Sequence, residues 1–229
     1  MVSIAFYFFS AIIIFSTTFV FLKFSPPEKR QSLFWFPFAI LIFQLLIAII
    51  GSTGFYIDFN VPPRLLYAGI IPSFILLATF SFSRTGNYFV QSIPVHLPIF
   101  FQSFRIIVEL FIYWVFLIGW GPEEATMMGY NYEFYFGITA IFFGIFVLKN
   151  KALKGLIIAW NVLGIIMLIV IVGIFFTSAL AWDTFWKKSI PMISNEMLQM
   201  PAMSIATLYM PLAFWSHIFS IRQMLQNRQ

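Results

Sequence analysis

One stretch of the chain combines the residue types best able to do chemistry inside an apolar protein. Gln102, Arg105 and Glu109 recur at spacings of three and four residues, so they share one face of a helix. Arg105 and Glu109 lie one turn apart and are therefore expected to form an ion pair. A self-neutralised pair of this kind can hold neighbouring helices in register, or it can form an anion or proton site with Glu109 as its gate. The spacing favours the structural interpretation and leaves the functional one open.

Two residues far along the chain are expected to meet this pair. At 1.5 Å per residue, Arg105, Asn161 and His217 lie at similar depths, roughly 8–12 Å from the cytoplasmic ends of their helices. Polar side chains at one depth bind helices together through hydrogen bonds and can also line a solvated pocket. The predicted polar pocket consists of Gln102, Arg105, Glu109, Asn161 and His217.

Neither a catalytic nor a cofactor site is predicted. The sequence has no cysteine, which excludes disulfides, thiolate metal sites and cysteine nucleophiles. It also lacks a glycine-rich phosphate loop, a Gly-x-Ser-x-Gly motif and a His-Glu-x-x-His motif. His96 and His217 are the only histidines, and their mismatched positions predict no haem. No lysine falls inside a predicted span, which excludes a covalent retinal. We expect no metal, no cofactor and no catalytic residue, and an enzyme is the least favoured class.

The elements that must position these residues follow from the composition. The 229 residues are 61% hydrophobic and only 9% charged, whereas soluble domains carry about 25% charged residues. With a mean hydropathy of +0.94, the chain is expected to be a polytopic membrane protein, all-α because lipid leaves no partner for unpaired backbone. We predict a single transmembrane domain over 1–229 with no soluble domain. The net charge of +5 does not indicate a nucleic-acid partner, because basic residues in the predicted cytoplasmic loops account for it.

The apolar stretches predict seven transmembrane helices. Their predicted ranges are 3–22, 33–51, 64–83, 97–118, 134–149, 154–180 and 199–221. Prolines, glycines and charges separate them, including Ser25–Arg30 after the first span, Pro62-Pro63 before the third and Arg84–Asn87 after it. Pro72 and Pro211 free the carbonyls of Ala68 and Thr207, which predicts kinks or polar contacts there.

The charges orient these spans. One side would carry nine basic residues against a single acid, Glu28; they are Lys23, Lys29, Arg30, Arg84, Lys149, Lys151, Lys154, Arg222 and Arg228. The other side would carry three basic residues against six acids, which are Asp58, Glu123, Glu124, Glu133, Asp183 and Glu196. The positive-inside rule then predicts the N-terminus outside and the C-terminus in the cytoplasm. The loops from Pro122 to Glu133 would form an acidic, aromatic outer mouth.

The third and seventh spans share a pattern of prolines followed by a serine and an arginine. One runs from Pro72 to Ser81 and Arg84, the other from Pro211 to Ser220 and Arg222, with the same spacing from proline to serine. Such matches suggest a 3+1+3 arrangement of parallel repeats around a linker helix. This architecture resembles that of the SWEET and PQ-loop transporters, although the chain has no Pro-Gln dipeptide.

Four stretches also resemble an uncharacterised bacterial family of seven-helix integral membrane proteins. They are Gln102–Leu110, Gly129–Ala140, Trp160–Gly164 and Ser216–Gln223. The chain departs from the usual family pattern at Glu133, where members carry Asp, and at Ala125–Met128, where they carry Met-Thr-Phe-Glu. The resemblance implies a bacterial inner (plasma) membrane and no particular activity.

The sequence favours a non-catalytic accessory or scaffold component of a membrane complex. Its partners would be the lipid bilayer together with another membrane protein or further copies of the chain. The alternative is a small-solute or ion transporter that uses the polar pocket around Arg105 and Glu109.

Overall fold

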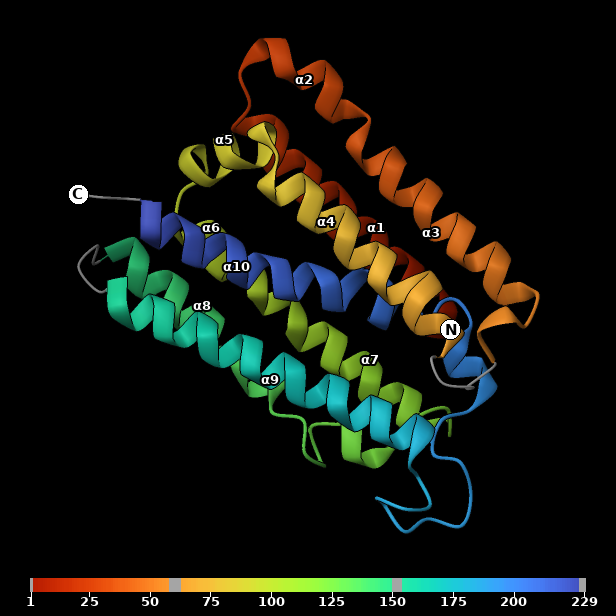
Figure 1. Ribbon diagram of the computed structural model, residues 1–229. Helices are drawn as coiled ribbons and strands as arrows, with labels where there is room; N and C mark the ends of the chain where they lie inside the picture. Colours follow the sequence, from red (N-terminus) through yellow and green to blue (C-terminus); the bar gives the residue numbers. More distant parts are fainter. Residues whose placement is uncertain (1, 58–62, 150–153, 227–229) are drawn as a thin grey trace. The chain divides into compact units, whose positions relative to one another are not determined.

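The computed structural model describes residues 2–57, 63–149 and 154–226, and these ranges contain helices and loops but no strand (Figure 1). The all-α prediction is confirmed. The chain forms two compact units. Unit 1 comprises Met1–Pro94 with Gln199–Pro211, and unit 2 comprises Val95–Leu198 with Leu212–Gln229.

Unit 1 begins with three helices, α1 (Val2–Lys23), α2 (Pro27–Phe34) and α3 (Phe36–Ser52). Only Trp35 separates α2 from α3, and the two follow one another along nearly one line (Figure 1). The loop predicted at Ser25–Arg30 is therefore shorter than expected. Pro26 and Pro27 occupy the N-cap and first helical positions of α2. A backbone N–H at these positions has no acceptor within the helix, so proline loses no hydrogen bond there.

The next part of unit 1 contains a short 3₁₀ turn, η1 (Phe55–Ile57), a π-helical turn, η2 (Leu66–Ile70), α4 (Ile71–Phe82) and α5 (Arg84–Ser92). The sequence predicts a loop at Arg84–Asn87, and this prediction is wrong. The Ser83 hydroxyl accepts a hydrogen bond of 3.0 Å from the Gly86 N–H and so caps α5. The axis bends by 69° between the Leu66–Phe82 and Arg84–Ser92 helices.

Both predicted proline sites are distorted in the same way. The π-helical turn η2 ends at Ile70, two residues before Pro72, and a second one, η6 (Ile205–Tyr209), ends two residues before Pro211. Proline cannot donate to the carbonyl four residues earlier, so the helix widens there and another donor is needed. For Thr207 that donor is Gln44 of α3, whose Nε2 lies 3.2 Å from the freed carbonyl oxygen. The predicted polar contact at Thr207 is confirmed.

Unit 2 begins with one helix in three parts. α6 (His96–Phe101), the 3₁₀ turn η3 (Gln102–Phe104) and α7 (Arg105–Leu117) together form a 22-residue helix. The 3₁₀ turns η4 (Glu123–Ala125) and η5 (Asn195–Leu198) lie in loops. The long helices are α8 (Glu133–Lys149), α9 (Lys154–Leu180) and α10 (Met210–Gln226). Of α10, the part from Leu212 onward belongs to unit 2. α8 and α9 match their predicted ranges within one residue.

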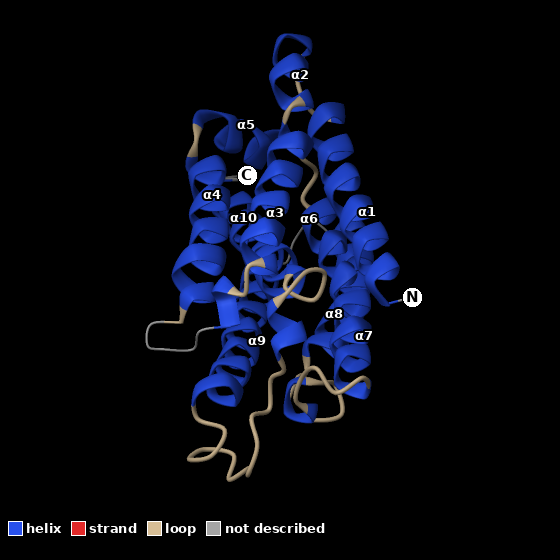
Figure 2. Ribbon diagram, turned by 90° about the vertical axis from the view of Figure 1, so that its right-hand side faces the viewer, coloured by secondary structure: helices blue, strands red, loops and turns tan. Residues whose placement is uncertain are grey.

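Small residues bring α8 against the helix formed by α6, η3 and α7. Gly137, Ala140 and Gly144 share one face of α8, and a side chain at either glycine would collide with the facing helix. A β-carbon on Gly137 would lie 3.1 Å from the backbone nitrogen of Ile106. Figure 2 shows α7 and α8 side by side.

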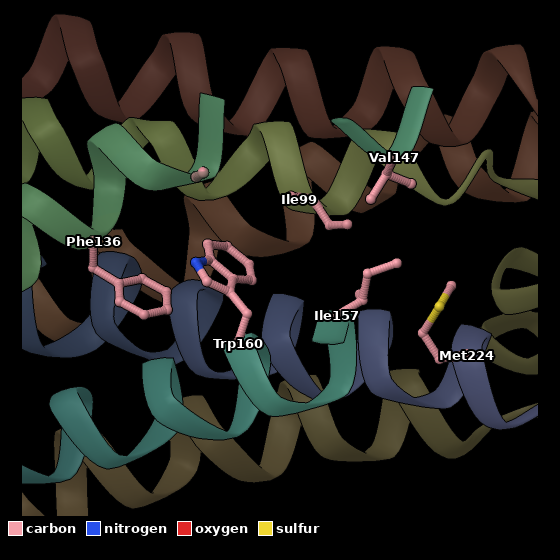
Figure 3. Close-up of a cluster of buried hydrophobic side chains, with 7 residues drawn as sticks. Ile99, Phe136, Val147, Ile157, Trp160 and Met224 are labelled. Carbon is pink, nitrogen blue, oxygen red and sulfur yellow. The ribbon is translucent and has the colours of Figure 1, made fainter. Parts of the chain in front are cut away.

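Apolar side chains from α6, α8, α9 and α10 form the core of unit 2 beneath this contact (Figure 3). The Trp160 ring stacks on Phe136 with centroids 4.6 Å apart, and its Nε1 donates to Thr139 at 3.1 Å. Ile99, Ile157 and Met224 extend the cluster. The stacked rings of Phe136 and Trp160 thus lie on the same helices, α8 and α9, as the polar residues described below.

Three helices of the described chain are long and apolar enough to cross a membrane: Ser3–Lys23, His96–Leu117 and Lys154–Leu180. The bent pair in unit 1 would be a fourth as a broken span. α3 and α8 each have 17 residues, which gives about 26 Å of helix against a hydrocarbon core of about 30 Å. Among the residues used for counting and orientation, Asp58, Pro62, Lys151 and Arg228 lie outside the described residues.

Candidate buried ion cluster

The central cation of unit 2 is Arg105, at the start of α7, and its ion-pair partner is Glu133 at the start of α8. Both residues are nearly closed to solvent, with 2% and 1% of their surfaces exposed. Arg105 does not form the predicted contact pair with Glu109, because its guanidinium reaches across to α8; the Glu109 carboxylate acts on Arg105 only through its charge. Arg105 also lies over the face of Phe136, with its guanidinium carbon 5.0 Å from the ring centroid.

His217 of α10 joins Arg105 to the neighbouring helix α9. Arg105 Nη1 lies 2.9 Å from His217 Nε2, and His217 Nδ1 lies 2.9 Å from the side-chain oxygen of Asn161. A guanidinium only donates and an amide oxygen only accepts, so Nε2 must accept and Nδ1 must carry the proton. The ring is therefore neutral, and neither nitrogen is free to bind a metal in this arrangement.

Asn161 extends the chain of hydrogen bonds. Its Nδ2 donates to the Ile157 carbonyl at 2.8 Å and to the Ser220 hydroxyl at 3.0 Å. Asn161, His217 and Ser220 are all fully buried. The direct sequence of contacts Glu133–Arg105–His217–Asn161–Ser220 thus connects α7, α8, α9 and α10.

Glu109 lies one helical turn after Arg105 and has a different partner. Its Oε2 accepts a hydrogen bond from Asn131 Nδ2, and the same amide group donates to the Ala125 carbonyl at 2.9 Å. Asn131 also accepts from the Glu133 N–H at 3.0 Å, so it caps the first turn of α8. Asn131 therefore joins the Glu109 carboxylate to the backbone at the start of α8.

Gln102 forms its hydrogen bonds with α10 and none with Arg105. Its Nε2 donates to the Ala213 carbonyl at 3.2 Å and to the Ser216 hydroxyl. The structure thus joins Arg105, His217 and Asn161 of the predicted pocket in one chain of contacts. Gln102 and Glu109 lie on the same helix face with partners of their own.

Two glycines make room for this cluster. A β-carbon on Gly164 of α9 would lie 2.3 Å from His217 Cε1, so only glycine lets the imidazole reach Asn161. On α8, Gly137 permits the close approach that brings Glu133 level with Arg105, since its β-carbon would stand 3.5 Å from that of Arg105. The His217 ring packs edge-on against Phe136 and Trp160, each 5.6 Å away.

The cluster holds more acid than base. Arg105 carries one positive charge, His217 is neutral, and Glu109 and Glu133 would carry two negative charges if both were ionised. An uncompensated charge is costly in an interior where each of these side chains is at most 3% exposed. Glu109, whose hydrogen-bond donor is the neutral amide of Asn131, is the carboxyl better suited to hold a proton.

Sequence reasoning missed Asn131 and Glu133 because it assigned both to an exposed outer loop. Both are buried, at 2% and 1% exposure. The available signal was local: Asn131 stands two residues before Glu133, which is the spacing of a side chain capping a helix start. Among the described residues, no group of three or more His, Cys, Asp or Glu side chains is placed to hold a metal ion.

The remaining outer-mouth residues form a surface contact between two loops of unit 2. Lys188 Nζ lies 2.9 Å from Glu124 Oε1, and Tyr130 stacks on Trp186 with centroids 5.9 Å apart. The hydrogen bond to the Glu124 carboxylate raises the pKa of Lys188 above its ordinary value. This surface pair of an exposed lysine and a half-buried carboxylate has no contact with the buried cluster among the described residues.

Comparison of the chain with protein-family models, with curated proteins and with solved structures gives no match.

Proposed function

We propose that this protein is a non-catalytic integral membrane protein that serves as an accessory or scaffold component of a membrane complex. The observation that carries this proposal is the closed ionic and hydrogen-bonded chain from Glu133 to Ser220. Each member is at most 2% exposed, and the chain connects four helices. Such a network fixes the relative register of helices that apolar packing alone leaves free to slide.

The proposed membrane arrangement has seven spans in a bacterial inner membrane, with the N-terminus outside and the C-terminus in the cytoplasm. The asymmetry of nine basic residues on one side against three on the other supports it. The matching π-helical turns before Pro72 and Pro211 support a 3+1+3 repeat. Single cysteines at Lys154 and Glu123 of this cysteine-free chain should react with an impermeant thiol reagent from opposite sides of the membrane. Reaction of both from one side would refute the orientation.

The scaffold role fits the broad apolar surface of the described helices. Phe8, Phe15 and Phe19 of α1 are 58–67% exposed, and Leu45 and Ile49 of α3 are 54–59% exposed. Lipid covers such faces, and so do partner helices.

The scaffold proposal is tested by extracting membranes with a mild detergent and sizing the protein on native gels. A scaffold should migrate in an assembly larger than one chain and one micelle. A variant that disrupts the cluster, Arg105→Ala, should lose the assembly together with the fold. The exposed control Lys188→Ala should keep both. Migration of the wild-type protein as a single chain under all extraction conditions would refute the scaffold role.

A second candidate is a small-solute or ion transporter in which the cluster binds the coupling proton. The unequal charges favour it, because two carboxyls beside one cation require a proton that a conformational change can release. In proteoliposomes, an inward pH gradient should then collapse faster than in protein-free vesicles, and Glu109→Gln should abolish the difference while the protein stays folded. Equal rates with and without protein would remove this candidate.

A further inference from the structure

The end of α1, the helix α2 and Trp35 in unit 1 line a groove with two chemically different halves. Its volume is about 800 Å³, and it is lined by Phe19, Leu22, Lys23, Arg30, Phe34 and Trp35. Phe19 and Leu22 belong to the last turns of α1, whereas Arg30 and Phe34 belong to α2. Two cations therefore share one concave surface with three aromatic side chains.

The cations of this groove have donors to spare. Arg30 uses its Nε in a hydrogen bond of 3.3 Å to the Ser25 carbonyl. A guanidinium carries five N–H groups, and among the described residues only this one has an acceptor, which leaves four for another ligand. Lys23 lies 5.7 Å from the Phe24 ring centroid and brings three further donors. The described residues that line the groove include no carboxylate.

The apolar half of the groove is open to an occupant. Phe19, Phe34 and Trp35 are 65%, 54% and 63% exposed, although each is a large apolar side chain. Phe19 lies on Ser3–Lys23, which is long and apolar enough to cross a membrane, and Lys23 ends that helix. An exposed tryptophan beside a cation at the end of a spanning helix is typical of the headgroup level of a bilayer.

We propose that this groove binds one anionic phospholipid. Its phosphodiester would accept hydrogen bonds from Lys23 and Arg30, and its acyl chains would lie along Phe19 and Leu22. The observation that selects this occupant is the pairing of two cations, in a lining that contains no described carboxylate, with an exposed apolar wall. A soluble anion gains nothing from the wall, and a zwitterionic lipid offers less to the cations. The inference rests on the proposed membrane placement of α1 and is independent of the ion cluster in unit 2.

The test counts lipids bound to the full-length protein by native mass spectrometry, with phosphatidylglycerol and phosphatidylcholine of identical acyl chains as probes. Phosphatidylglycerol should bind more tightly than phosphatidylcholine. The double variant Lys23→Gln/Arg30→Gln should lose about 30-fold in phosphatidylglycerol affinity, as expected for two cations at a lipid surface. Its affinity for phosphatidylcholine should not change. Both residues are exposed, so the variant should fold.

Two further variants keep the result interpretable. Arg84→Gln/Lys154→Gln removes two exposed cations that lie outside the groove and should leave lipid binding intact. Lys23→Arg/Arg30→Lys preserves the charge and should retain most of the binding.

Equal losses in the two glutamine variants would overturn the proposal, because they would show a general charge effect. Displacement of phosphatidylglycerol by millimolar glycerol phosphate would also overturn it in favour of a free phosphate site. Opposite-side labelling of Lys154 and Glu123 cysteines together with no lipid selectivity would refute the groove and leave the membrane orientation intact.

Discussion

Replacing Arg105 with methionine removes the cation of the buried cluster while keeping most of its volume. Glu133 then remains buried without a counter-charge, and removal of one partner from such a pair costs about 3–5 kcal/mol. The acceptor nitrogen of His217 also loses its donor, which accounts for about 1 kcal/mol or more of this cost. We therefore expect the free energy of unfolding to fall by about 4 kcal/mol.

The informative comparison is with the double variant Arg105→Met/Glu133→Leu. Removing both charges and filling their space with apolar groups is often nearly neutral, so the double variant should be more stable than Arg105→Met by about 2 kcal/mol or more. Equilibrium unfolding in mixed micelles of a mild detergent and dodecyl sulfate, followed by tryptophan fluorescence, measures these differences.

The control for this cycle is the surface pair in the same unit, in which Lys188 is exposed and Glu124 is half-buried. Lys188→Met/Glu124→Leu should show no measurable coupling, because solvent screens charges at the surface. If the double variant of the buried pair is as unstable as the sum of its single variants, the two residues do not interact energetically. The proposed role of the cluster would then fail.

Two substitutions test other contacts by the same unfolding assay. Gly164→Ala should destabilise the protein by about 1–3 kcal/mol, because the new β-carbon collides with His217. Gly173→Ala on the same helix meets nothing within 4 Å and should be neutral or stabilising; equal losses at both sites would point to a general need for glycine in α9. Gln44→Leu should cost about 1–3 kcal/mol by leaving the Thr207 carbonyl without its side-chain donor, and unchanged stability would show that this hydrogen bond contributes nothing.

Much of the helical framework follows from local sequence. α9 begins and ends where the apolar run does, at Lys154 and Leu180, because lipid-compatible helices end where charges or loop residues begin. The disturbance before Pro72 and Pro211 is equally local, since a proline always lacks its hydrogen-bond donor. The helical character of α2 and α5 was missed because polar residues such as Arg84 also occur in capped interfacial helices.

The need to bury Arg105 with a partner also follows from the sequence alone. A charge in the middle of a 22-residue apolar helix must be compensated, and His217 and Asn161 were available at matching depth. The sequence does not determine which carboxylate compensates it. Glu109 at i+4 was the local candidate, but spacing along a helix only permits such a pair.

The tertiary structure decides in favour of Glu133. The glycine at position 137 lets α8 approach α7 until the first turn of α8 faces Arg105, and Asn131 then holds Glu109 in a separate hydrogen bond. The choice between Glu109 and Glu133 depends on how closely the axes of α7 and α8 approach each other. One additional methyl group at position 137 would obstruct that approach. A one-dimensional pattern fixes which residues lie on a helix face, whereas the packing of neighbouring helices determines which of them touch.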